Sequence, residues 1–355
     1  MFRIKKRNIL WLDVSIIMIL AITLVSACTS STSTPTPTST VQAPVPLGSA
    51  ANFAILSKSG ISSHGLIKRV PMQPYSLGKG AIGMVTREED AVRLLEVADT
   101  HNYLLLCSDR GRMFSIKYDE LPPDSSRISK GTALSNLFPI PSNEHITDMV
   151  VIKEFTPDAY LLMGTRKGEI KKTSLDNFAG MQTSGLICMD VEEGDALIAA
   201  RTATENDDVV MVTKKGQSIR FAVSSIRNSQ CASGGVKGIR LNDGDEVIGM
   251  GIAYPNSHVL VISTEGYGKR TRVEAYPKQG RAGSGVKTIK LVDKTGYLAG
   301  AKIVKPSCQI VIVSANGIVT RTRINEISVL SRGSQGVLLI KLDSGDKVVS
   351  FAVLD

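Results

Sequence analysis

The stretch at residues 259–270 reads VLVISTEGYGKR, and its pattern decides the fold. An apolar run from Val259 to Ile262 leads into a turn around Gly266, and a strand with Lys269 and Arg270 follows. A short run of branched apolar residues bounded by a glycine turn is typical of a buried strand that enters a tight hairpin. The stretch therefore predicts a β-hairpin with one apolar strand and one strand that carries basic residues.

The same hairpin pattern recurs along the chain with a period of about 50 residues. Its turn glycines are Gly65, Gly111, Gly168, Gly216, Gly266 and Gly317. A second glycine follows each turn after 15 to 20 residues and leads into two further short strands: Gly80, Gly131, Gly185, Gly235, Gly285 and Gly336. Four short strands repeated at this period indicate a propeller-like array. The alternative is a β-sandwich with coincidental spacing, but two independent glycine landmarks agree across the copies.

We therefore predict an all-β fold, a six-bladed propeller-like array of four-stranded repeats over residues 64–355. The repeats are expected at 64–99, 100–152, 153–204, 205–254, 255–304 and 305–355.

Several segments of these repeats resemble the C-terminal domain of gyrase A. They are Lys130–Ala133, Gly235–Leu241, Gly266–Thr271, Gln335–Val337 and Lys341–Lys347. The resemblance extends over about 290 residues. It implies a β-pinwheel that wraps duplex DNA around its outer rim as the accessory domain of a type II topoisomerase. It further implies the N-terminal part of gyrase A and gyrase B as partners, with topoisomerase IV as the alternative lineage.

Basic residues recur around the hairpins and form the predicted DNA-binding set. The set is Lys68, Arg69, Lys79, Arg110, Arg112, Lys171, Lys172, Arg220, Lys237, Lys269, Arg270, Arg272, Arg321 and Arg323. Residues two apart on a strand share one face, so repetition around the array predicts a curved basic rim. Such a rim neutralises phosphates along bent DNA without reading bases.

The first repeat departs from the gyrase pattern. The family carries a glutamine-arginine-arginine-glycine-glycine-lysine-glycine box there, whereas residues 75–84 read YSLGKGAIGM and keep only Gly78, Lys79 and Gly80. This loss favours binding and bending of DNA over chiral wrapping.

The N-terminus predicts a secretory leader. Basic residues Lys5 to Arg7 precede an apolar run at 9–25, and residues 24–28 read LVSAC. This ending resembles the lipobox of bacterial lipoproteins, which implies a signal peptide at 1–28 and lipidation of Cys28; an uncleaved membrane anchor is the alternative. A charge-free Ser/Thr/Pro-rich linker is predicted at 29–46, and residues 47–63 resemble the opening strand of secreted ice-binding-like domains.

Composition and motifs point away from catalysis. The formal charge is +9, of which the leader supplies +3, so the remainder has a moderate basic excess of +6. The five cysteines form no Cys-x-x-Cys pair and the four histidines are scattered, so we expect no metal. Gly78, Gly80 and Gly83 match a dinucleotide spacing but open no predicted βαβ unit. We expect no cofactor and no enzymatic activity, because the breakage-reunion domain of gyrase and its catalytic tyrosine are missing from this sequence.

Three interpretations remain open. The first is a DNA-binding module of the gyrase A type, which the family places in the cytoplasm with the nucleoid. The second is an extracytoplasmic, membrane-anchored lipoprotein whose propeller binds another anionic ligand. The third is a fusion, by rearrangement or faulty assembly, of a leader and a gyrase fragment near Ser62 to His64.

Overall fold

The computed structural model describes residues 53–60, 62–71, 91–123 and 131–354. The chain divides into Met1–Leu47 and Gly48–Asp355, and the described residues all belong to the second unit. The predicted leader, Cys28, the linker and the Lys79 segment lie outside the described residues. No helix in the described part of the chain is long and apolar enough to cross a membrane.

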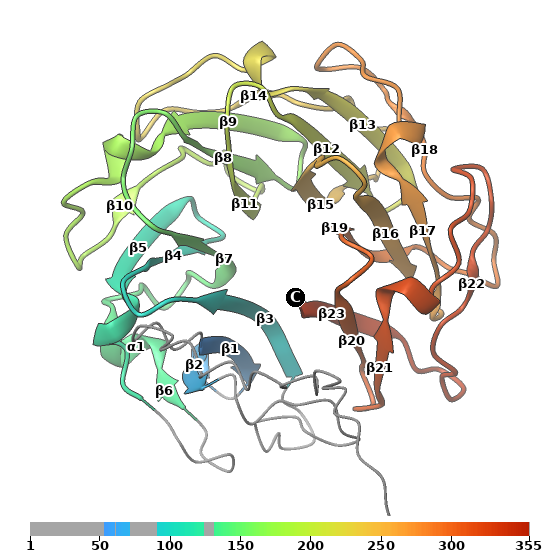
Figure 1. The fold of residues 1–355 in the computed structure, drawn as a ribbon, viewed down its shortest axis with the longest axis horizontal. Coiled ribbons are helices and arrows are strands. Elements are labelled where there is room, and N and C mark those ends of the chain that lie inside the picture. The colour runs from blue at the N-terminus through green and yellow to red at the C-terminus, as the bar shows by residue number, and fades with distance from the viewer. Residues whose placement is uncertain (1–52, 61, 72–90, 124–130, 355) are drawn as a thin grey trace, which may run out of the picture. The chain divides into compact units, whose positions relative to one another are not determined.

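Small antiparallel sheets follow one another around a ring, in chain order (Figure 1). The first contains β1 (Phe53–Gly60), β2 (Ser62–Pro71), β3 (Ala91–Ala98) and β6 (Thr132–Ala133). The second contains β4 (Tyr103–Ser108), β5 (Arg112–Lys117), β7 (Ile146–Ile152) and β10 (Leu186–Ile187). The third contains β8 (Tyr160–Thr165), β9 (Glu169–Ser174), β11 (Leu197–Ala203) and β14 (Val236–Lys237).

The second half of the ring continues the same plan. The fourth sheet contains β12 (Asp208–Thr213), β13 (Gln217–Ala222), β15 (Val247–Ile252) and β18 (Val286–Lys287). The fifth contains β16 (His258–Ser263), β17 (Tyr267–Arg272), β19 (Leu298–Val304) and β22 (Val337–Leu338). The sixth contains β20 (Gln309–Ser314), β21 (Val319–Arg323) and β23 (Val348–Leu354).

Short helical turns connect the hairpins to the outer strands. They are η2 (Tyr118–Glu120), η3 (Leu175–Phe178), η4 (Val223–Ser225), η5 (Val273–Ala275) and η6 (Ile324–Glu326), whereas the short helix α1 (Leu134–Leu137) follows the outer strand β6.

The core lies between successive sheets. All six residues of β12 and of β16 are buried, because these apolar strands are covered on both faces. Five hydrophobic clusters each join two neighbouring sheets; Leu162 and Ile170 of the third, for example, pack with Met211 and Phe221 of the fourth. Burial of each large apolar side chain stabilises the fold by about 1.5–3 kcal/mol relative to exposure.

The outer strand of each four-stranded sheet comes from the following repeat. Leu186 of β10, which belongs to the third repeat, pairs with Met113 of β5 in the second sheet. The strands β6, β14, β18 and β22 cross over in the same way. The glycine before the strand allows this close crossing: at Gly285, where φ is +72°, an added Cβ would lie 2.2 Å from the carbonyl oxygen of Ser218.

The prediction of six four-stranded repeats needs a correction. Five sheets have four strands, whereas the sixth has three within the described residues. In the other five sheets the outer strand comes from the following repeat, whereas among the described residues no such strand pairs with β21.

The first hairpin also differs from its prediction. Gly65 lies inside β2 rather than in the turn, although it keeps a φ of 91°. The two strands continue to pair as far as Gly60 and Ser62, so the chain reverses there. Since β1 falls within 47–63, the first sheet extends across the boundary that the sequence places at residue 64.

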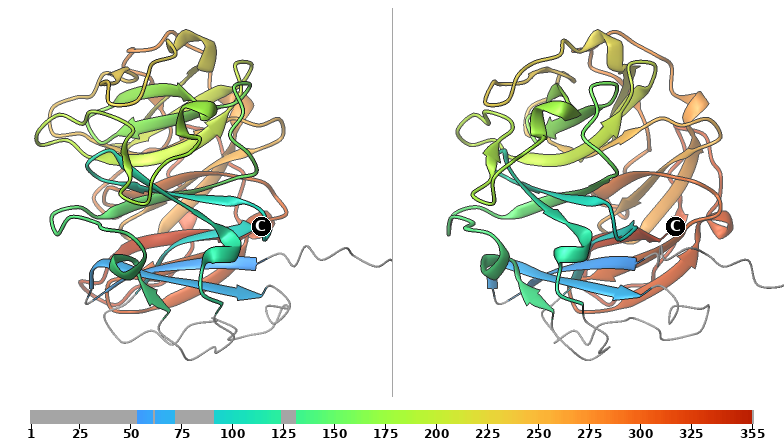
Figure 2. Two further views of the ribbon diagram at one scale, coloured as in Figure 1. Left: turned by 90° about the vertical axis from the view of Figure 1, so that its left-hand side faces the viewer. Right: turned by 60° about the vertical axis from the view of Figure 1, so that its left-hand side comes forward.

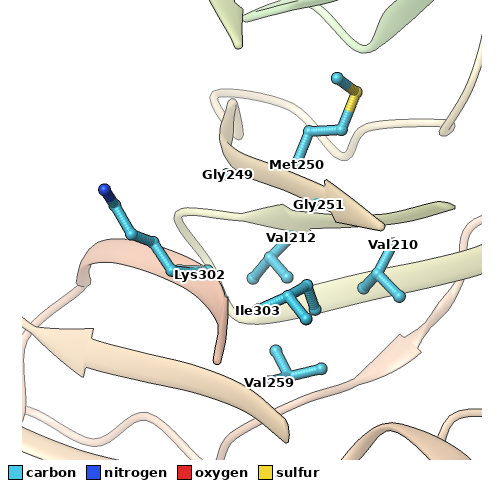
Figure 3. A pocket seen from close by; sticks show the side chains of 9 residues that line it. Val210, Val212, Gly249, Met250, Gly251, Val259, Lys302 and Ile303 are labelled. Carbon is cyan, nitrogen blue, oxygen red and sulfur yellow. The ribbon is translucent and has the colours of Figure 1, made fainter. Parts of the chain in front are cut away.

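Inner strands pack closely around the centre of the ring. The inner strand of the sixth sheet, β23, contacts that of the first, β3, and Figure 2 shows the red and blue sheets side by side in both views. Between the fourth and fifth sheets, an added Cβ at Gly249 would lie 2.4 Å from the carbonyl oxygen of Ala301. The hollow left beside these strands measures about 10 Å³, and Lys302 points away from its valines (Figure 3). It is too small to bind an organic ligand.

Candidate nucleic-acid interface

Five of the predicted DNA-binding side chains are buried. They are Lys68, Lys171, Lys172, Lys269 and Arg270, with exposed fractions of 1%, 1%, 3%, 0% and 8%. A buried cation cannot reach a phosphate on a rigid duplex, so the structure removes these residues from the predicted rim.

A repeated contact explains why one class of these cations is internal. Four residues after the turn glycine, Arg270 donates from Nε to the carbonyl oxygen of Ile327 (2.7 Å) and from NH2 to that of Asn325 (3.0 Å). These carbonyls belong to η6 and its end, in the next repeat. Such oxygens lack intrahelical partners, and charge-assisted hydrogen bonds satisfy them.

In three other repeats, the equivalent cation donates to the carbonyl oxygen of the first residue of the corresponding 3-10 turn. Arg69 NH1 donates to the carbonyl oxygen of Tyr118 (3.0 Å), Lys172 Nζ to that of Val223 (3.3 Å), and Arg220 NH1 to that of Val273 (3.1 Å). We call Arg69, Lys172, Arg220 and Arg270 the carbonyl clamp. Its role is to attach the first, third, fourth and fifth sheets to the 3-10 turn of the next repeat.

Two buried lysines, each one residue before a clamp cation in the sequence, also bind backbone carbonyls. Lys171 Nζ donates to the carbonyl oxygens of Cys188 (2.7 Å) and Ser233 (2.9 Å). Lys269 Nζ donates to that of Arg332 (2.8 Å), and burial, followed by the Arg332 charge, lowers the pKa of Lys269 to about 8. Both lysines therefore stabilise the crossing loops from inside.

The other predicted residues are distributed over several environments. Arg110, Lys237, Arg272, Arg321 and Arg323 are exposed. Arg112 is partly exposed and pairs with Glu144 (3.3 Å), and Arg220 pairs with Asp208 (2.9 Å). The structure therefore leaves only part of the predicted set available to a ligand.

Exposed cations also lie on the outer strands and just after them, where the prediction named Lys237 but missed Arg240, Lys287 and Lys290. Two and five residues after the second glycine landmark, the fourth repeat carries Lys237 and Arg240, and the fifth carries Lys287 and Lys290; all four are exposed. The strands β14 and β18 lie at the periphery of the ring (Figure 1).

An arginine from the following repeat joins each pair. Arg281 NH1 donates to the carbonyl oxygen of Lys237 (2.6 Å), and Arg332 NH1 donates to that of Lys287 (3.2 Å). We define the first outer trio as Lys237, Arg240 and Arg281, and the second outer trio as Lys287, Lys290 and Arg332. The two trios have the same construction on successive sheets.

The charge is not continued evenly around the ring. In the third repeat, the positions equivalent to a trio hold Ile187, Asp190 and, from the next repeat, Cys231. The sixth repeat holds Leu338 and Lys341. The basic surface is therefore concentrated on the outer strands of the third and fourth sheets.

The family described as DNA gyrase C-terminal domain, beta-propeller, matches residues 102–153, 159–204, 207–253, 257–305 and 309–355. The chain belongs to this family. The resemblance seen in the sequence is thus confirmed, as is the all-β propeller of small antiparallel sheets.

Relatives of this gyrase C-terminal-type domain are longer proteins. The DNA gyrase A protein of Dehalogenimonas lykanthroporepellens is 45% identical over 304 residues, which are 83% of this chain and 37% of that protein. The DNA gyrase A protein of Escherichia coli K12 is 36% identical over 81% of this chain and 33% of that protein. The chain thus spans about a third of the length of these relatives.

Solved structures share the fold of this domain. A DNA gyrase A C-terminal domain superposes with a TM-score of 0.72 at 24% identity, covering 86% of this chain and all of that one. The C-terminal domain of a DNA topoisomerase IV gives a TM-score of 0.71 at 20% identity, covering 87% of this chain and 95% of that one.

Within the described part of this gyrase C-terminal-type domain, no group of histidine, cysteine and carboxylate side chains could hold a metal ion. Burial raises the pKa of Cys188 to about 12, so its thiol is protonated at neutral pH and is a poor nucleophile. A hollow of about 350 Å³ is lined by Glu96, Lys153, Arg201 and Tyr254, among others, with charges of both signs. Unlike this hollow, the outer trios carry charges of one sign, and the same arrangement of cations occurs on two successive sheets.

Proposed function

We propose that this domain binds and bends duplex DNA without sequence specificity, as the accessory C-terminal domain of a type II topoisomerase. The observation that carries this proposal is the pair of outer trios, which present equivalent clusters of exposed and partly exposed cations on successive sheets. Cations at regular positions on a curved array neutralise phosphates and release counterions. Contacts with phosphates carry no sequence information, so the binding is nonspecific.

The relatives support the same proposal for the complete assembly. They are DNA gyrase A proteins and are about three times as long as the matched segment. We propose that the partners of this domain are the N-terminal part of gyrase A and gyrase B. On its own the domain is proposed to bind DNA without breaking strands or hydrolysing ATP.

The test is a titration of a fluorescent linear duplex with the protein at several salt concentrations. We expect the fourfold variant Lys237→Gln, Arg240→Gln, Lys287→Gln and Lys290→Gln to bind at least about tenfold more weakly. The slope of log affinity against log salt should fall by about 0.9 for each phosphate contact removed, or about 3 to 4 altogether.

A matched control separates the trios from overall charge. Lys117, Lys153, Arg166 and Lys305 are exposed and lie away from the trios in sequence and element. Their fourfold substitution by glutamine changes the net charge equally and should leave affinity within about twofold. Equal weakening by both variants, or binding by neither the native protein nor the control, would contradict the assignment of the trios.

A second candidate function rests on the leader. The basic start, the apolar run and the LVSAC ending at residues 24–28 support an extracytoplasmic lipoprotein whose propeller binds an anionic surface polymer. Cell fractionation with mass spectrometry of the mature N-terminus tests this candidate. A lipidated Cys28 in the membrane fraction would support it. A soluble cytoplasmic product would exclude it, and so would a genomic sequence in which the leader and the domain are not joined.

A further inference from the structure

Five junctions join successive sheets through an exchanged outer strand, and four of them share an outer fastening. In these four, a clamp cation and an isolated parallel bridge connect the hairpin to the next repeat. The bridges are Arg69 with Pro123, Lys172 with Asn228, Arg220 with Lys278 and Arg270 with Val329. The first–second, third–fourth, fourth–fifth and fifth–sixth junctions are therefore fastened alike.

The junction between the second and third sheets lacks this fastening. The clamp position four residues after Gly111 holds Ser115, which is too short to reach the next repeat's turn. Among the described residues, no parallel bridge and no clamp hydrogen bond joins Ser115 to the third repeat. The difference is confined to one of five equivalent places, so the other four serve as internal references.

Backbone bonds show the same contrast. The carbonyl oxygen of Lys172 accepts from Ser229 N (2.9 Å), that of Arg220 from Gln279 N (2.8 Å), and that of Arg270 from Leu330 N (2.9 Å). Counted from the first residue of the 3-10 turn, the equivalent pair at the second–third junction is Ser115 and Met181, and the backbone bonds of the described chain do not include it.

The crossing loop at this junction is also shorter. From Gly168 to Gly185 it spans 17 residues, against 19 from Gly216 to Gly235. Met181 of this loop packs, partly buried, against the apolar cluster of the junction, so apolar contacts hold the loop in the place of a clamp cation and a parallel bridge.

The inner side of the same junction is firmly attached. Asp148 on β7 accepts a hydrogen bond from Ala200 N on β11 (2.8 Å) and pairs with Arg201. Asp148 is only 5% exposed, and an apolar cluster that includes Leu105, Met163 and Ala200 fills the space between the two sheets. The junction thus combines a fixed inner edge with an unfastened outer edge.

We propose that the second–third junction is the hinge of the array, which opens at its outer edge and pivots at Asp148. Opening there changes the curvature of the rim between the second sheet, which lacks a trio, and the basic third and fourth sheets. Local openings of this kind occur where few contacts must break, and they precede global unfolding. The hinge is a property of the protein without DNA. Any effect of its opening on bound DNA rests on the proposed function.

Hydrogen exchange of the full-length protein without DNA tests the hinge. Cys188 N and Gly238 N are equivalent amides, and each donates to a turn glycine carbonyl across its junction, Gly111 and Gly168, at 2.8 Å. We expect the segment 179–189 to exchange at least about tenfold faster than the segment 229–239. Equal exchange of the two segments would overturn the proposal, whether or not the protein binds DNA.

Reciprocal variants then test the cause. Ser115→Lys places an ammonium where it can reach the carbonyl of Leu175, the equivalent of Val223, and should slow exchange of 179–189. Ser115→Ala is the matched control and should leave it unchanged. Lys172→Ser should speed exchange of 229–239 and leave 179–189 as it was. If Ser115→Lys and Lys172→Ser both leave their junctions unchanged, the missing clamp is not what makes the hinge and the proposal fails.

Discussion

Arg270 and Arg321 occupy the same position, four residues after a turn glycine, yet their environments are opposite. Arg270 is 8% exposed and binds carbonyls of the sixth repeat, whereas Arg321 is exposed and donates to Gln309 within its own sheet (2.9 Å). The sequence around the two residues does not distinguish these roles. The partner of Arg270 is a backbone carbonyl, which every residue type possesses, so no side-chain pattern announces the contact.

This difference predicts opposite results for the same substitution. Arg270→Met leaves the carbonyls of Ile327 and Asn325 without their charged donor and should lower the free energy of unfolding by about 1.5–3 kcal/mol. Arg321→Met removes an exposed contact and should change it by no more than about 0.5 kcal/mol. Urea denaturation followed by circular dichroism measures both. A rim role for Arg270 would instead require unchanged stability and weaker DNA binding.

At the scale of strands, the sequence predicted the hairpins well and the crossovers poorly. The apolar run and turn glycine of each hairpin are local signals, and the structure places β12 and β13, or β16 and β17, where those signals lie. The outer strands β10, β14, β18 and β22 have two residues each, which is too short for any periodicity. Their pairing is between backbones of different repeats, so the three-stranded sixth sheet could not be foreseen.

The proposed interface, the outer trios, has the basic chemistry that the sequence predicted but shares only Lys237 with the predicted set. Basic residues after the turns drew attention because they recur, but recurrence in this fold also marks the clamp. The sequence does contain a signal for the trios, because Arg240 and Lys290 each stand five residues after the second glycine of their repeat. What the sequence could not supply was that Arg281 and Arg332 fold back onto the preceding repeat.

Over the whole ring, the distribution of charge bears on how far a duplex could follow the rim. The trios cover the outer strands of the third and fourth sheets, whereas Ile187 and Asp190 interrupt the series on the second and Leu338 weakens it on the fifth. Bending a site of 20–30 base pairs costs about 1–6 kcal/mol, which a limited set of phosphate contacts can offset. A continued wrap needs contacts along its full length, and the interrupted series does not provide them.

The last prediction therefore separates bending from chiral wrapping. A relaxed plasmid is incubated with increasing protein in the presence of a type I topoisomerase, and its linking number is measured after the protein is removed. We expect little or no shift, because the basic arc covers only part of the ring and residues 78–80 keep only a fragment of the family's box. Circular permutation of a bound fragment should still show bending. The native protein and the fourfold trio variant are compared at equal occupancy, so that weak binding is not mistaken for the absence of wrapping. A one-handed change in linking number that grows with bound protein would contradict this expectation, and it would mean that the remaining cations, Arg110, Arg272 and Arg323 among them, complete the path of the duplex.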